Sequence, residues 1–392
     1  MAALLDSAAS AQDIRLTPLI DARVRWEDVD QADIARKADA VTARVRSGLA
    51  VASGPLTALV ETEATLALAE RYDSGTNGRT SFPLVADPQN VELNRAQLRY
   101  AYHGVTVTAG RQLIELADQR FVGSASWRQN QQTFDAARVQ LGDPKRFFAD
   151  VTYAWSDRTV NGVDGTGSRP TAIGGNNLFA SAGTATPIGT LTGFAYLIDQ
   201  DNPAVQGFRL SNQTYGVRLN GTRRIGPARL AYAGTWARQS DWARNPNRYA
   251  ATYWLAEATG TLGIVSATVG HETLGADDGR ALTSVQTPLA SVFRFNGWTG
   301  KFATTPPNGL RDLYATGALG WKELGPFTGA ALGATWHRFR SDRLDQRYGS
   351  EWDLLANVKR GRTALSARYA RYRAEQFATN TDRFWLQAEW AL

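Results

Sequence analysis

The sequence ends with Asp382-Arg-Phe-Trp-Leu-Gln-Ala-Glu-Trp-Ala-Leu392, a stretch in which apolar and polar side chains alternate. A period of two is typical of a β-strand with one face in apolar and the other in polar surroundings. About eighteen segments of the chain show this pattern, and the connections between them alternate between very short and long. Tight turns at one rim and long loops at the other are typical of a closed barrel in a membrane, because lipid does not tolerate an open sheet edge. We therefore expect an all-β, transmembrane, antiparallel up-and-down β-barrel with short periplasmic turns and long extracellular loops.

The expected strands each span about ten residues, the length that a tilted membrane strand requires. Tight turns follow the even-numbered segments, and one of them is expected at Gly260-Thr261. Long loops follow odd-numbered segments, as at 113–132 and 273–309. The segments lie near residues 19–27, 40–52, 56–69, 92–102, 105–112, 133–141, 147–156, 176–183, 188–199, 213–224, 228–238, 249–259, 262–272, 310–319, 327–339, 351–359, 363–373 and 382–392.

Composition agrees with a barrel and argues against a helical core. The 392 residues include 12 Trp, 13 Tyr, 15 Phe and 36 Gly but a single Met, a balance that suits strands and interfacial aromatic girdles. Five of the 43 basic residues are lysine, and the net charge is +6. The arginines are scattered among carboxylates, which argues against a nucleic-acid partner.

The sequence shows no linker that would divide it, so residues 12–392 are expected to form one outer-membrane barrel domain. Ala9-Ser10-Ala11 resembles a signal-peptidase site, although the preceding residues are too few for a full secretory leader. Residues 1–11 are therefore expected to be the remnant of a leader or a disordered N-terminus.

Alternation assigns a set of charged side chains to the inner face of the barrel. Faces so rich in charge need water, which indicates a channel in place of a dry core. Guanidinium groups inside a low-dielectric wall would concentrate anions, although the carboxylates could instead neutralise them as an internal ion-pair lattice that stiffens the barrel. The predicted pore-lining residues are Arg23, Arg25, Arg44, Arg46, Glu61, Glu63, Arg95, Arg99, Arg218 and Asp353.

The long loops at 113–132 and 273–309 carry too many aromatic residues to extend freely into solvent. We expect them to fold against the barrel wall or into its mouth. Their polar and aromatic side chains are then either contacts for a solute or anchors that pack on the wall. The residues predicted to form this constriction are Arg120, Trp127, Arg128, Asn130, Asn296 and Trp298.

Several motifs resemble those of the alginate export family of outer-membrane porins. They are Val91-Glu-Leu-Asn-Arg95, Gly110-Arg-Gln112, Trp127-Arg-Gln-Asn130, Phe295-Asn-Gly-Trp298 and Thr305-Pro-Pro-Asn-Gly-Leu310. The resemblance extends from about Ile20 to Leu392 and implies an eighteen-stranded barrel. The family includes the exporter of the polyuronate alginate, in which arginines constrict an electropositive pore.

The chain departs from the family pattern next to the Phe-Asn-Gly-Trp motif. Phe293-Arg294 stands where the family commonly has His and then Ala, and Thr299-Gly300 stands where an Ala-Asp pair is usual. These differences concern the solute, not the barrel.

The sequence offers no catalytic or metal-binding pattern. His103, His271 and His337 fall on different hairpins, cysteine is absent, and there is no Gly-x-Ser-x-Gly motif. We therefore expect no enzymatic activity, no metal and no cofactor.

The sequence favours a monomeric porin in the outer membrane of a Gram-negative cell, surrounded by outer-membrane lipid. Anionic solutes, either sugar acids or an acidic polysaccharide such as alginate, would diffuse passively through its Arg-lined pore. One alternative is an outer-membrane barrel enzyme that acts on lipid or glycan, and another is a soluble glycan-binding β-protein.

Overall fold

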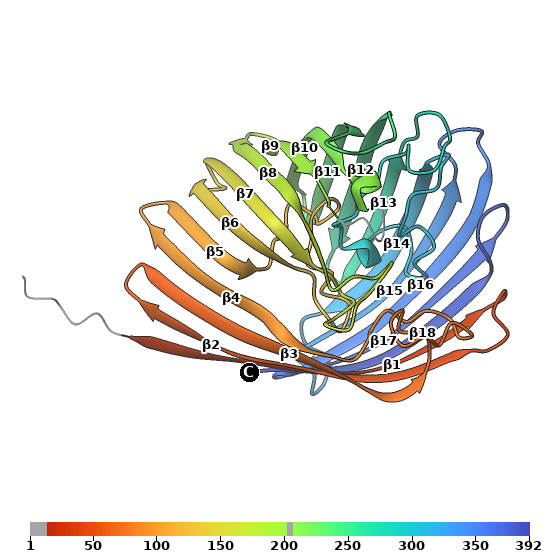
Figure 1. Cartoon of the computed structure of the whole chain (residues 1–392), viewed down its shortest axis with the longest axis horizontal. Coiled ribbons are helices and arrows are strands. Elements are labelled where there is room, and N and C mark those ends of the chain that lie inside the picture. The colour runs from red at the N-terminus through yellow and green to blue at the C-terminus, as the bar shows by residue number, and fades with distance from the viewer. Residues whose placement is uncertain (1–13, 202–206) are drawn as a thin grey trace, which may run out of the picture.

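The strands pair in chain order and close into one sheet (Figure 1). A computed structural model describes residues 14–201 and 207–392. Within them lie eighteen strands, and every pair of neighbours is antiparallel. The strands are β1 (Arg15–Gln31), β2 (Ala38–Ser53), β3 (Leu56–Arg71), β4 (Asn90–Tyr102), β5 (Val105–Gln112), β6 (Thr133–Gly142), β7 (Phe147–Arg158), β8 (Ala172–Thr186), β9 (Gly189–Ile198), β10 (Asn212–Ile225), β11 (Ala228–Asp241), β12 (Ala250–Leu262), β13 (Val265–Leu274), β14 (Leu310–Trp321), β15 (Gly329–Arg340), β16 (Arg347–Arg360), β17 (Thr363–Ala374) and β18 (Thr381–Ala391).

The barrel closes between its first and last strands. β1 pairs with β18 from Asp21 opposite Ala391 to Gln31 opposite Thr381. This closure removes the open edge that lipid would not tolerate. The predicted fold class, an antiparallel eighteen-stranded barrel, is confirmed.

Helix contributes little to the described residues. Two short 3-10 helices, η1 (Gly207–Leu210) and η2 (Val292–Arg294), lie in connections between strands. No helix in the described ranges is long and apolar enough to cross a membrane. The leader or disordered segment predicted for residues 1–11 lies outside the described residues.

Apolar side chains cover the outside of the barrel and charged side chains lie inside it. On β2, Val45 is 48% exposed on the outer face, whereas its neighbours Arg44 and Arg46 are buried. On β1, Val24 is likewise exposed between the buried Arg23 and Arg25. The two faces therefore meet lipid and a polar interior, as the period of two requires.

Most strands extend beyond the segments that alternation marks, and one predicted turn is wrong. β1 runs from Arg15 to Gln31, and the alternation fades near its end because Asp28 and Asp30 place polar groups on the outer face that carries Val24. β12 continues through the predicted turn at Gly260-Thr261, and the chain reverses at Gly263 instead. Gly263 has φ +59, a conformation that glycine adopts without steric cost.

Two long loops fold into the barrel and pair with each other there. Val122, in the loop after β5, bridges Leu289, in the loop after β13. The Gly123 amide donates to the Leu289 carbonyl at 2.9 Å. An internal apolar cluster that includes Phe121, Tyr196 and Tyr253 packs these loops against the wall. The loops thereby divide the lumen and position the candidate site.

Candidate functional site

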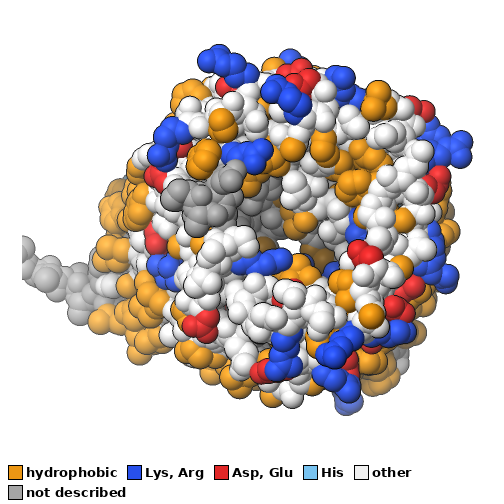
Figure 2. Space-filling model, turned by 45° about the vertical axis from the view of Figure 1, so that its right-hand side comes forward, with side chains coloured by type: hydrophobic (Ala, Val, Ile, Leu, Met, Phe, Trp, Pro, Cys, Tyr) orange, Lys and Arg blue, Asp and Glu red, His pale blue; other side chains and the backbone are white. Residues whose placement is uncertain are grey.

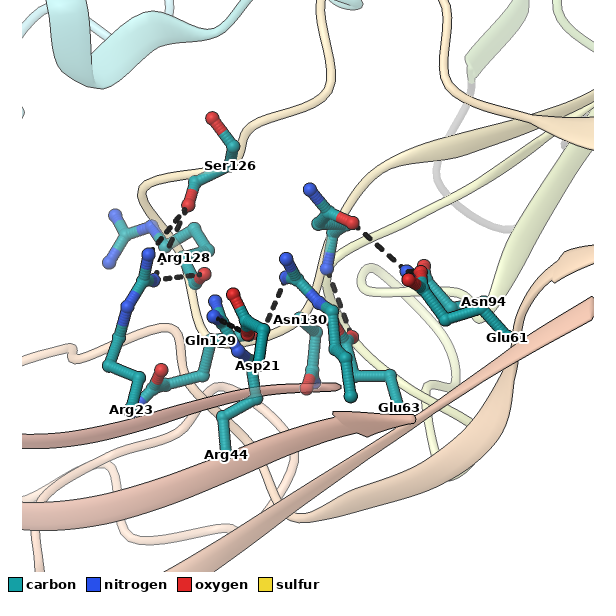
Figure 3. A network of polar contacts seen from close by, with 12 residues as sticks. Asp21, Arg23, Arg44, Glu61, Glu63, Asn94, Ser126, Arg128, Gln129 and Asn130 are labelled. Atoms are coloured by element: carbon teal, nitrogen blue, oxygen red, sulfur yellow. Dashed lines mark hydrogen bonds and ion pairs between the residues drawn. The ribbon is translucent and has the colours of Figure 1, made fainter. Parts of the chain in front are cut away.

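Arginines of β1 bind the backbone of the loop between β5 and β6, residues 113–132, which we call the first inner loop. Arg23 Nη1 donates to the carbonyl oxygens of Ser126 and Arg128 at 3.3 and 3.1 Å (Figure 3). It also donates to the Trp127 carbonyl at 3.1 Å. Arg25 Nη2 donates to the Trp127 carbonyl at 2.5 Å. Carbonyl groups in a loop that leaves the strand ladder need such donors. These two predicted pore-lining residues therefore hold the loop inside the barrel.

A second set of charges forms ion pairs along β1 to β4, which we call the wall lattice (Asp21, Arg44, Arg46, Glu61, Glu63 and Arg95). Arg44 pairs with Asp21, and Arg46 pairs with Glu63. Arg95 binds Glu61 through Nε at 2.8 Å and Nη2 at 2.5 Å.

The wall lattice also holds the first inner loop. Glu63 accepts a hydrogen bond from the Gln131 amide at 3.1 Å, and Arg46 donates to the Gln129 carbonyl at 3.3 Å. The alternation of side chains placed these groups on one face, and the structure brings them into contact. Their pairing supports the lattice interpretation for this part of the wall.

The remaining predicted pore-lining residues have different surroundings. Arg99 is exposed, and the described residues offer it no ion pair. Arg218 Nη1 lies 2.7 Å from Asp118 Oδ2, so this strand residue also binds the first inner loop. Asp353 is buried, with Oδ2 at 3.6 Å from His337 Nε2.

Three of the six predicted constriction residues are buried anchors. Arg120 Nε lies 2.8 Å from Glu272 Oε1, and its Nη2 donates to Asn296 Oδ1 at 2.9 Å. Asn296 Nδ2 donates in turn to Glu272 Oε2 at 2.7 Å. Asn130 donates to the carbonyl groups of Pro88 and Val160, both at 3.2 Å. These hydrogen bonds join the inner loops to each other and to the wall.

The other three constriction residues, Trp127, Arg128 and Trp298, line an open cavity. Trp127 stacks on Phe293 with ring centroids 4.0 Å apart and planes 9° apart. Trp298 also stacks on Phe293, with ring centroids 5.9 Å apart and planes 13° apart. The loops thus present a stack of three aromatic rings to the lumen.

Arg368 of β17 completes this stack and was not among the predicted residues. Its guanidinium carbon lies 4.4 Å from the Trp127 ring and 4.7 Å from the Trp298 ring. Cations are attracted to aromatic faces at such distances. Alternation in the segment 363–373 places Arg368 on the inner face, since Leu365 is exposed outside. Applying the period of two to that strand would have found it.

We call the space beside this stack the mouth cavity, which has a volume of about 880 Å³. Figure 2 shows an opening in the face of the molecule that it presents. Within the described residues, one carboxylate lines the cavity, that of Glu389, which binds Arg23 Nε at 2.6 Å. The arginines that line it are Arg23, Arg128, Arg169, Arg294 and Arg368.

The first inner loop and the strands around it lie within a match to a known family. Residues 15–170 match the model described as alginate export. The predicted resemblance to the alginate export family is confirmed over these residues. A search of curated proteins gave no significant match.

Solved structures with the same fold align over nearly the whole chain. Acinetobacter baumannii OccAB4 is 11% identical, with a TM-score of 0.73 over 97% of this chain and 98% of that chain. Pseudomonas aeruginosa OpdK, solved with vanillate, is 12% identical, with a TM-score of 0.72 over 96% and 98%. P. aeruginosa OccK2 (OpdF), solved with glucuronate, is 12% identical, with a TM-score of 0.67 over 96% and 98%.

These neighbours place the fold among outer-membrane barrels. OpdK is described as an outer membrane protein. The apolar outer surface and the closed sheet of this chain fit that location.

Proposed function

We propose that this protein is an outer-membrane channel through which anionic solutes diffuse passively, guided by the arginines of the mouth cavity. The observation that carries the proposal is the charge of that cavity, where five arginines face a single carboxylate among the described residues. A cleft of one sign inside low-dielectric walls raises the local concentration of the opposite charge. The cavity would therefore favour anions over cations.

The same lining favours solutes that combine a carboxylate with a ring. A guanidinium group offers paired donors that match the two oxygens of a carboxylate. The stacked Trp127, Phe293 and Trp298 rings offer a flat apolar face beside those donors. Solved neighbours hold vanillate and glucuronate, which both have a ring and a carboxylate. Sugar acids, free or within an acidic polysaccharide such as alginate, are the solute class that we propose.

The wall lattice has a different role in this proposal. Its arginines are paired with carboxylates, so they line the pore mainly as supports for the inner loops. Arg128, Arg294 and Arg368 would contact the solute, because the described residues give them no ion pair. We propose that residues 12–392 form one monomeric channel domain without catalytic activity.

Reversal potentials in a salt gradient test the proposal directly. A variant with Arg128, Arg294 and Arg368 replaced by Gln should lose about tenfold in its anion-to-cation permeability ratio. Arg71→Gln is the control, because that side chain is 71% exposed on the outer surface and should not affect the pore. An unchanged ratio in the triple variant would remove the selectivity claim. Chemical analysis of solutes recovered after transport should show no turnover.

A further inference from the structure

The outer surface of the barrel carries a shallow apolar groove that the pore does not use. It has a volume of about 660 Å³ and crosses β1, β2 and β14 to β18. Its floor is formed by small residues, since Ala356 of β16 pairs with Ala367 of β17, and Ala388 of β18 lies next to them. Larger side chains, including Leu332 and Trp26, form its sides. The outer wall is thus hollowed where neighbouring strands carry alanine.

The groove ends at the periplasmic rim of the barrel. Trp321 and Leu324, at the turn between β14 and β15, line this end. Val358 also lines the groove, and Arg360 lies two residues further along β16 on the same face. The tight turn after β16 then places Arg362 beside it.

Basic side chains without carboxylate partners surround that end. Arg360, Arg362 and Lys322 are all exposed. The described part of the chain records no ion pair for any of the three. Glu323 lies in the same rim, but it is not within ion-pair distance of Lys322 in the described residues. The end of the groove therefore carries an excess of positive charge at the level where strands leave the apolar layer.

We propose that this groove is a binding site for an anionic phospholipid of the periplasmic leaflet, such as phosphatidylglycerol. One acyl chain would lie over Ala356, Ala367 and Ala388, and the phosphate would bind Arg360, Arg362 and Lys322. The apolar sides fit a chain, and the cations at one end fit a single headgroup at the membrane surface. A zwitterionic lipid offers the same chain but no net charge to balance those cations. The site is separate from the pore and does not depend on the proposed solute.

Native mass spectrometry with equal amounts of phosphatidylglycerol and phosphatidylethanolamine of the same acyl chains tests the site. The parent protein should retain phosphatidylglycerol preferentially. A variant with Lys322, Arg360 and Arg362 replaced by Gln should lose this preference, with binding weakened about fivefold for each cation.

A matched control removes three arginines from the same rim elsewhere. Arg223, Arg224 and Arg229 flank the turn between β10 and β11, where the strands do not border the groove. Replacing these three by Gln should leave the lipid preference unchanged. Equal loss in the two triple variants, or no preference in the parent, would overturn the proposal.

A third variant tests the groove without changing charge. Ala367→Phe should reduce retention of both lipids by filling the floor, and Ala356→Leu provides a second way to fill it. Gel mobility with and without heating shows whether each variant forms the barrel. Undiminished retention of phosphatidylglycerol by a folded, filled variant would contradict the groove as its site.

Discussion

Two groups of arginines lie inside this barrel, and their surroundings differ. In the wall lattice, Arg46 is buried against Glu63, and Arg95 binds Glu61 through two nitrogen atoms. In the mouth cavity, Arg368 faces aromatic rings, and Arg128 and Arg294 line open space. Arg46, Arg95 and Arg368 follow the same alternation along their strands, whereas Arg128 and Arg294 lie in connections between strands. The comparison shows that an inward-facing arginine is a candidate for solute contact only where no carboxylate already occupies its donors.

Trp127 is held by the barrel wall and also shapes the mouth cavity. Its carbonyl oxygen accepts hydrogen bonds from Arg23 and Arg25, whereas its ring lies against Arg368 and Phe293. The loop backbone is thus held by the wall, and its side chain shapes the cavity. The backbone of Trp127 therefore takes part in supporting the loop, whereas its ring lines the cavity that a solute would enter.

The largest expected effect comes from breaking a pair of the wall lattice. Glu63→Ala leaves Arg46 buried without its carboxylate, which should destabilise the barrel by about 3 kcal/mol. Urea unfolding, followed by gel mobility without heating, measures this loss. The double variant Arg46→Ala and Glu63→Ala should recover part of it, and anion selectivity should change little in both. A large change in anion selectivity without a loss of stability would show that the wall lattice selects the solute, which contradicts the roles that we assign.

Trp127→Ala should have the next largest effect. It removes one of the stacked rings, and with it the aromatic face against which two guanidinium groups lie. We expect a stability loss of about 2 kcal/mol and a higher single-channel conductance as the cavity widens. Trp127→Phe keeps an aromatic face and should lie between the parent and the alanine variant. Conductance below the parent value would show that the loop collapses into the opening.

Glu389→Gln tests the mouth cavity by removing a negative charge instead of a positive one. This change removes the carboxylate that lines the mouth cavity and releases Arg23 Nε from its ion pair. Anion preference should therefore increase, by about threefold in permeability ratio. Reversal potentials measure the change, and Glu323→Gln at the periplasmic rim is the matched control. A decrease would mean that Glu389 positions Arg23 for the solute.

The smallest expected effect depends on pH. Burial, with the charge of Arg383 next in importance, lowers the pKa of Lys301 to about 8, and its Nζ donates to Gln31 at 3.2 Å. The unfolded chain holds this proton up to a pKa near 10.4. Stability should therefore rise slightly between pH 8 and pH 10, because the unfolded chain holds the proton that the folded chain releases. Unfolding midpoints across that range should rise less in Lys301→Met, and equal slopes would exclude the assignment.

Much of the barrel could be predicted from local pattern. Every strand depends on alternation, and the short turns depend on residues such as Gly54 and Gly361, which adopt positive φ. The turn at Gly263 was misplaced by a few residues because Gly260 is also present, and only strand pairing distinguishes the two. The predicted strands also end too early, because strand pairing continues where the alternation of side chains fades.

The candidate site was predicted less completely. Trp127, Arg128 and Trp298 line the mouth cavity, but Arg120, Asn130 and Asn296 are buried anchors that hydrogen-bond to the loops and the wall. Arg368 and Glu389 lie on strands at a distance in sequence from the inner loops. Their contacts exist because the barrel closes and the loops fold inward, which no local pattern encodes.

The sequence by itself determined the class of the molecule, because a period of two and alternating connection lengths depend only on neighbouring residues. It also determined which side chains point inward. The tertiary structure alone decided which arginines are neutralised and which remain available, because that depends on distances between β1, β17, β18 and two loops far apart in the chain. Charge is set residue by residue, whereas its effect on a solute is set by what lies within a few ångströms in the folded barrel.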